Sequence, residues 1–299
     1  MKDKLCQILS DLYAEYDFLL DDKVLTNAEK DFFARVGDGM DETAASAALR
    51  RLCAFLYKYY HKRVIILLDE YDTPMQEASL NGYWEELSDF IRIMLHATFK
   101  DNPYMERGIL TGITRVSKES VFSDLNNLKV VTVVSAKYET AFGFTEAEVF
   151  AALEEYGMSD RKEEVKQWYD GFKFGKHDNI YNPWSVINYL DEGECKAYWA
   201  NTASNSLAGK LILAGGASRQ LVMEDLLMGK TMQTQIEEEI IFTQLDRKKH
   251  AVWSLLLASG YLKIVREESG RRGRKEYVLA LTNMEVRMMF DEIIKGKKI

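Results

Sequence analysis

The chain has 299 residues, of which 47% are hydrophobic and 12% aromatic, so it can bury a sizeable core in one large or two medium domains. Its formal net charge of −8 argues against a protein that coats nucleic acid through bulk positive charge, although a local basic patch is compatible with it. Scattered cysteines and histidines and the lack of a long apolar run argue against a disulfide framework, a metal cluster and a membrane span. We therefore expect a cytoplasmic protein.

Residues 1–145 carry the pattern of an α/β domain. The first sixty residues have helical periodicity, and Thr26 with Glu29 has the spacing of a capping box. Continuous apolar runs follow at 64–68, 106–112 and 129–135, with helical spacing between the first two. Apolar strands separated by helical segments predict a mostly parallel sheet that helices cover on both faces.

Residues 146–232 are predicted to form a helical lid. Thr145 and Glu148 have the spacing of a second capping box, and Asn182 before Pro183 is a good start for a helix. Between them, FKF and NIY flank the residues GKHD as the two strands of a hairpin.

Residues 233–299 are predicted to form a winged-helix-like module, because a helix, two strands and a last helix from Asn283 follow one another. The basic turn between these strands could contact phosphate, or it could be a solvated hairpin turn. Its basic residues are Arg271, Arg272, Arg274 and Lys275.

In the stretch VIILLDEYDTP (64–74), an apolar run typical of a strand is followed directly by Asp69 and Glu70. In open α/β sheets ligands lie beyond the carboxyl ends of the strands, so a functional site is expected at these two acids. An apolar strand that ends in Asp-Glu is the Walker B pattern, in which the Asp orders Mg²⁺ and the Glu polarises the attacking water. The same residues also fit a strand that merely leaves the core into a polar loop.

Several longer motifs accompany this strand. They are LLDEYDTPM (67–75), ILTGITRVSKESVFSDLNNL (109–128), WYDGFKFG (168–175) and IYNPWSVINYL (180–190). In these motifs the chain resembles the AAA-ATPase-like family. Members of this family are predicted P-loop ATPases, and they often carry a C-terminal nuclease-like domain. The resemblance implies an incomplete P-loop NTPase-like parallel sheet with flanking helices, the helical lid, the winged-helix-like module, and ATP with Mg²⁺ as cofactors.

The resemblance also implies roles for individual residues. Asp69 would hold the metal and Glu70 would be catalytic, while Thr111 and Thr114 follow the second strand, where related ATPases place a sensor of the γ-phosphate. Arg115 could contact the nucleotide, act as an intersubunit finger or form a structural salt bridge. Asn127, beside Asn126, could lie near the nucleotide or shape a tight turn.

The chain departs from this family in one essential motif, because it contains no GxxxxGK[ST] loop to cradle phosphates. The nearest segments, MGKTM (228–232) and GFKFGKH (171–177), have the wrong spacing. We therefore expect an N-terminally truncated chain that also lacks the nuclease-like domain and does not hydrolyse ATP alone. The missing strand would leave a gap, which we expect the 129–135 strand to close by pairing with the strand at 108–112; the N-terminal helices or a second chain could fill it instead.

Two other functions are compatible with the sequence. One is a non-catalytic interaction or regulatory module, with the winged-helix-like tail contacting a nucleic acid or protein partner, and with oligomers possible. The other is a metal-dependent nuclease that uses Asp69 and Glu70, but the Lys of an ExK pattern does not adjoin these acids.

Overall fold

The computed structural model describes residues 2–21, 23–37, 39–113, 125, 128–202, 206–238, 245, 248, 250–270 and 274–296. The chain forms two compact units, the first built from residues 1–128 and the second from the described residues after 128. Each unit is considered by itself. The structure is α/β, with one parallel strand pair and two antiparallel sheets in its described part. The three-part division at residues 145 and 232 stays a prediction.

The first unit is mainly helical, and local capping fixes where its helices begin. The predicted capping box of Thr26 and Glu29 is confirmed, and Asp41 caps the longest helix by accepting the Ala44 N–H at 2.7 Å. The helices are α1 (Lys2–Ala14), α2 (Phe18–Asp21), α3 (Asn27–Arg35), α4 (Glu42–Tyr60), α5 (Thr73–Asn81) and α6 (Trp84–Phe99), and the strands are β1 (Val64–Leu68) and β2 (Met105–Leu110).

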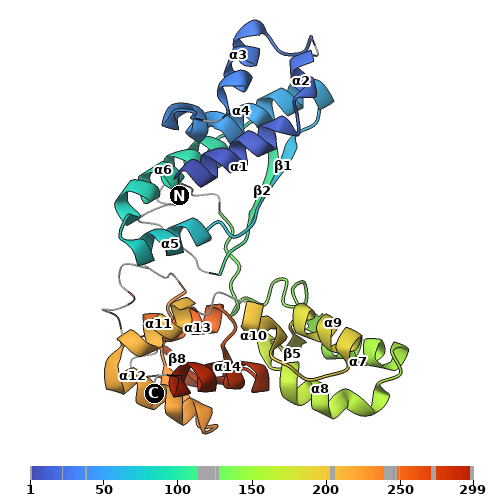
Figure 1. Ribbon diagram of the computed structural model, residues 1–299, viewed down its shortest axis with the longest axis vertical. Coiled ribbons are helices and arrows are strands. Elements are labelled where there is room, and N and C mark those ends of the chain that lie inside the picture. The colour runs from blue at the N-terminus through green and yellow to red at the C-terminus, as the bar shows by residue number, and fades with distance from the viewer. Residues whose placement is uncertain are drawn as a thin grey trace. The chain divides into compact units, whose positions relative to one another are not determined.

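The predicted parallel pairing of the first two apolar runs is confirmed. Strand β1 pairs with β2, and the register places Leu67 opposite Ile109. Helices α4 and α6 pack against each other on one side of this strand pair (Figure 1). The other face is open, since the exposed fractions are 56% for Ile65, 74% for Leu67 and 45% for Ile109. The expectation that both faces are buried is therefore wrong within this unit, because its helices cover a single face.

The prediction of a third strand at 129–135 is also wrong. Residues 128–132 have no regular structure, and a turn follows in which the Ser135 N–H donates to the Thr132 carbonyl at 2.9 Å. This segment belongs to the second unit, so the predicted closure of the gap by pairing 129–135 with β2 does not occur. A β-branched sequence becomes a strand only where a neighbouring strand supplies the ladder of hydrogen bonds, and none of the described strands pairs with this segment.

The second unit combines helices with two small antiparallel sheets of strand order β3-β5-β4 and β6-β8-β7. Its helices are α7 (Glu146–Glu155), η1 (Ser159–Arg161), α8 (Lys162–Tyr169), α9 (Pro183–Glu192), α10 (Tyr198–Thr202), α11 (Ser206–Ala214), α12 (Gly216–Leu227), α13 (Ala251–Ala258) and α14 (Met284–Lys295). Its strands are β3 (Phe144–Thr145), β4 (Phe172–Phe174), β5 (His177–Tyr181), β6 (Met232–Thr234), β7 (Leu262–Ser269) and β8 (Lys275–Leu281).

Most local predictions in this unit are confirmed. The capping box of Thr145 is present, Asn182 caps α9, and β4 and β5 form the predicted hairpin. Helix α13, strands β7 and β8, and helix α14 follow in the predicted order, and Asn283 caps α14. Buried aromatic residues, Tyr169, Tyr181 and Tyr189, join α7, α8 and α9 in one apolar core. In the described residues no helix is long and apolar enough to cross a membrane.

Candidate functional site

The carboxyl ends of β1 and β2 lie side by side, and backbone pairing continues just beyond both strands. The Thr111 N–H donates to the Leu68 carbonyl at 2.9 Å, and the Tyr71 N–H donates to the Thr111 carbonyl at 3.1 Å. These two hydrogen bonds hold the residues after each strand at a common rim. Polar side chains that follow the two strands are thereby brought together.

Asp69 and Thr111 meet at this rim although 42 positions separate them in the chain. The Thr111 hydroxyl donates a hydrogen bond to the Asp69 carboxylate, and the Glu70 N–H donates to the same carboxylate oxygen at 3.0 Å. Asp69 as a whole is exposed. The arrangement presents a carboxylate and a hydroxyl, both hard oxygen ligands, at the end of a parallel strand pair.

Glu70 occupies an uncommon backbone conformation. Its φ of 50° lies in the left-handed region, which side chains other than glycine rarely adopt. The side chain is exposed, and the nearby Thr73 hydroxyl lies 3.4 Å from one carboxylate oxygen. Backbone strain of this kind costs about 1–3 kcal/mol.

Asp72, which closely follows the two exposed acids in the chain, is itself buried. It is 1% exposed, it begins α5, and it accepts a hydrogen bond from the Gln76 side chain at 3.0 Å. Gly112 lies directly against it, because a Cβ atom at Gly112 would be 2.4 Å from an Asp72 carboxylate oxygen. The close approach of Gly112 carried no sequence signal.

Replacing Gly112 with alanine is expected to destabilise the first unit by about 1–3 kcal/mol, because the added methyl group overpacks against Asp72. The strain should also separate Thr111 from Asp69. Denaturant unfolding followed through the amide resonances of β1 and β2 would measure the loss within the first unit. Gly37→Ala is the matched control, since nothing lies within 4 Å of a Cβ atom there. Equal unfolding midpoints for the two variants would contradict the expectation.

The other predicted site residues cannot be placed. Thr114, Arg115 and Asn127 lie outside the described residues, as does Asn126. Within the described ranges there is no group of three or more His, Cys, Asp or Glu side chains that could hold a metal ion alone. The oxygens of Asp69 and Thr111 still suit Mg²⁺, which usually binds one or two carboxylates together with substrate phosphates and water.

The two segments nearest to a phosphate loop lie in the wrong structural context. MGKTM (228–232) follows the end of α12 and leads into β6. In GFKFGKH (171–177), Gly175 and Lys176 form the turn between β4 and β5. A phosphate loop instead connects a strand to the start of a helix. Neither segment can cradle phosphates in that manner.

Ligands of open α/β sheets bind beyond the carboxyl ends of the strands, which is where Asp69 and Thr111 lie. Residues 1–122 match the AAA-ATPase-like family, whose description is "Predicted AAA-ATPase". The resemblance noted in the sequence is therefore confirmed for residues 1–122, which make up nearly all of the first unit.

A curated relative extends the comparison beyond this region. The chain is 27% identical over 236 residues to a protein of Azotobacter chroococcum mcd 1 described as "Uncharacterized protein in vnfD 5'region". The match covers 78% of this chain but 43% of the relative, so the chain spans less than half of that protein's length. No solved structure matches the chain.

Proposed function

We propose that the first unit is the Walker B and sensor side of an ATPase. The contact between Asp69 and Thr111 at the ends of two parallel strands is the observation that carries this proposal. In this assignment Asp69 holds the metal, Glu70 orients the attacking water, and Thr111 fixes the Asp69 carboxylate while sensing the γ-phosphate. Thr114, Arg115 and Asn127 would complete the sensor side. The family match over residues 1–122 supports the same class of protein.

ATP and Mg²⁺ are the cofactors that this site would use. Bound Mg²⁺ would neutralise developing charge on the phosphates. The metal side of the site fits, because Asp69 is exposed and oriented by two hydrogen bonds. The phosphate side does not fit within this chain, because no GxxxxGK[ST] segment is present in its 299 residues. We therefore propose that residues 1–299 contribute acids to an ATPase site without forming the whole site.

Purified chain 1–299 is expected to show no Mg²⁺-dependent phosphate release from ATP above that of the Glu70→Gln variant. Each missing charge-assisted contact to the β- and γ-phosphates removes roughly 1.5–3 kcal/mol of binding. A coupled phosphate assay at saturating Mg²⁺ measures the rate. Steady phosphate release by the wild type that Glu70→Gln abolishes would contradict this proposal.

A positive test of the metal side uses Mn²⁺ in place of Mg²⁺. Paramagnetic broadening of amide resonances at 69–72 and 111–113 is expected for the wild type and should disappear in Asp69→Asn. Asp89→Asn is the matched control, because Asp89 is an exposed acid on α6 paired with Arg92. Broadening that survives Asp69→Asn would remove Asp69 from the proposed role.

A second candidate function concerns the C-terminal part of the second unit, as a winged-helix-like interaction module. Along the described part of its hairpin the charges are mixed and paired, with Lys275 3.0 Å from Glu267 and Arg266 2.8 Å from Glu268. Arg271 and Arg272 of the predicted basic turn lie outside the described residues. The paired charges favour a protein partner over the continuous phosphate charge of a nucleic acid.

A further inference from the structure

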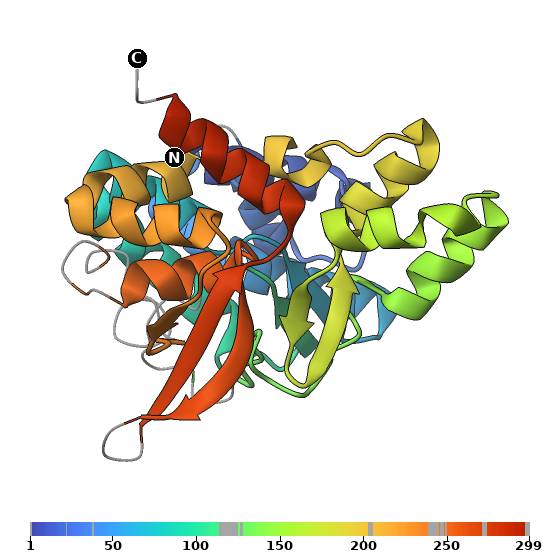
Figure 2. The same cartoon turned by 90° about the horizontal axis from the view of Figure 1, so that it is seen from below.

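Two of the four edge strands described in the second unit, β4 and β7, lie close to each other. Strand β4 is at one end of the order β3-β5-β4, and β7 is at one end of β6-β8-β7. Among the described residues no backbone hydrogen bond joins the outer edge of either strand to another strand. The two hairpins lie next to each other (Figure 2), and β4 approaches β7. Unpaired edges are templates on which an extended peptide can add as a further strand.

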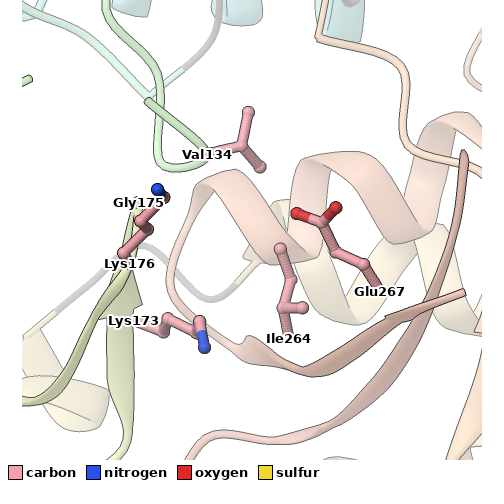
Figure 3. Close-up of a pocket in the computed structure, with 6 residues that line it drawn as sticks. All are labelled: Val134, Lys173, Gly175, Lys176, Ile264 and Glu267. Carbon is pink, nitrogen blue, oxygen red and sulfur yellow. The ribbon is translucent and has the colours of Figure 1, made fainter. Parts of the chain in front are cut away.

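These two edges meet at one end and leave a cavity at the other. They meet where the Lys263 ammonium packs beside Gly171 and the Phe172 ring lies against Gly260. Beyond that point a cavity of about 190 Å³ opens (Figure 3). Its lining residues are Val134, Lys173, Gly175, Lys176, Ile264 and Glu267. The cavity therefore lies between the turn that follows β4 and the middle of β7.

The size and lining of this cavity suit a side chain better than a small molecule. Ligand pockets usually have volumes of about 300–1,000 Å³, so 190 Å³ is too small for a nucleotide. Val134 and Ile264 face the cavity from opposite walls in Figure 3 and provide apolar surface for one inserted side chain. A peptide that pairs with a strand edge presents alternate side chains to such a pocket, which gives the contact its specificity.

The charges around the cavity favour an acidic guest. Lys176 is exposed and makes no ion pair within the described ranges, while Lys173 is bound to Asp178 at 2.8 Å. The loop that supplies Val134 carries two further lysines, Lys129 and Lys137, which lie close enough that the Lys137 ammonium lowers the pKa of Lys129. The same loop carries Glu139, whose carboxylate accepts the Lys176 backbone N–H at 3.0 Å. Glu267 is the acid in the lining, and its carboxylate is already paired with Lys275.

We propose that the outer edge of β7 binds an extended, acidic peptide segment of a partner protein. The bulge between Ile264 and Arg266 limits strand pairing to residues 266–269. One apolar side chain of the peptide enters between Val134 and Ile264, and an adjacent carboxylate pairs with Lys176. This interaction does not depend on the proposed ATPase role of the first unit.

Selection of phage-displayed 12-residue random peptides on the full chain tests this inference. Enriched peptides are expected to be acidic with one large apolar residue, and to bind in fluorescence anisotropy. Lys176→Glu should weaken their binding about fivefold or more, because the charge contact reverses sign. Lys210→Glu is the matched control, since Lys210 is an exposed residue of α11 outside the cavity lining. Amide shifts confined to 173–176 and 264–269 should accompany binding.

Several results would overturn the proposal. These are a failure to enrich any peptide, enrichment of basic peptides, or equal binding by wild type and Lys176→Glu with unchanged thermal unfolding. A labelled 12-nucleotide oligo(dT) is the competing probe. If it binds the wild type and is lost in Lys176→Glu, the surface binds nucleic acid and the peptide proposal is wrong.

Discussion

Replacing Gly171 with alanine is expected to disrupt the second unit more than any surface change. Gly171 has a φ of +125°, which is available almost only to glycine, and a Cβ atom there would lie 2.2 Å from the Thr282 carbonyl oxygen. That obstacle is backbone at the end of β8, so it cannot move aside like a flexible side chain. Backbone strain and overpacking together should cost about 3 kcal/mol or more.

Unfolding in denaturant would show this loss through tryptophan fluorescence, because Trp168, Trp184, Trp199 and Trp253 all belong to the second unit. Gly157→Ala provides the control, since Gly157 has a φ of +72° but nothing lies within 4 Å of a Cβ atom. That variant carries the conformational penalty alone, about 1–2 kcal/mol. Similar midpoints for the two alanine variants would show that the approach of Thr282 does not matter.

Features fixed by neighbours in the chain were predictable from the sequence. Thr26 and Thr145 each meet their capping glutamate three residues later, and Asn182 and Asn283 cap helices through the next residues. The hairpin of β4 and β5 also depends on a short turn. In each case the hydrogen-bonding partners lie within a few positions, so composition and spacing contain the necessary information.

Features that need distant partners were predicted less completely. The parallel pairing of β1 and β2 followed from two apolar runs joined by a helical segment. The segment 129–135 is rich in β-branched residues but pairs with none of the described strands, so composition alone gave the wrong structure. The open face of Ile65 and Leu67 was missed for a related reason, because apolar strands predict burial without naming the element that covers them.

The candidate site likewise has features that the sequence predicted and features that it did not. The rule that ligands lie at the carboxyl ends of strands pointed to Asp69 and Thr111, and the structure places them in contact. Nothing in the spacing predicted the left-handed conformation of Glu70 or the packing of Gly112 on Asp72, since both depend on three-dimensional crowding. The roles of Asp69, Thr111, Glu70, Thr114, Arg115 and Asn127 stay predictions.

Glu285→Ala is expected to destabilise the second unit strongly. Glu285 is fully buried at the start of α14 and accepts three hydrogen bonds. The Ser185 hydroxyl donates at 2.9 Å, and the Trp199 and Ala200 N–H groups donate at 2.6 and 3.2 Å. Removing the carboxylate leaves these donors buried without an acceptor, which should cost about 3 kcal/mol or more. The carboxylate thus joins α14 to α9 and α10.

Glu285→Gln separates the charge from the shape of this side chain. Burial raises the pKa of Glu285, and the three hydrogen bonds oppose that rise without cancelling it. The folded state therefore holds the proton more tightly than the unfolded state. The resulting stabilisation is full below the unfolded pKa of about 4.3 and is lost as the pH rises through the folded pKa. The advantage of wild type over Glu285→Gln in unfolding free energy should accordingly be larger at pH 4 than at pH 7, as denaturant midpoints would show. An advantage that grows with pH would mean that the three donors outweigh burial, and that Glu285 is held as an anion by α9 and α10.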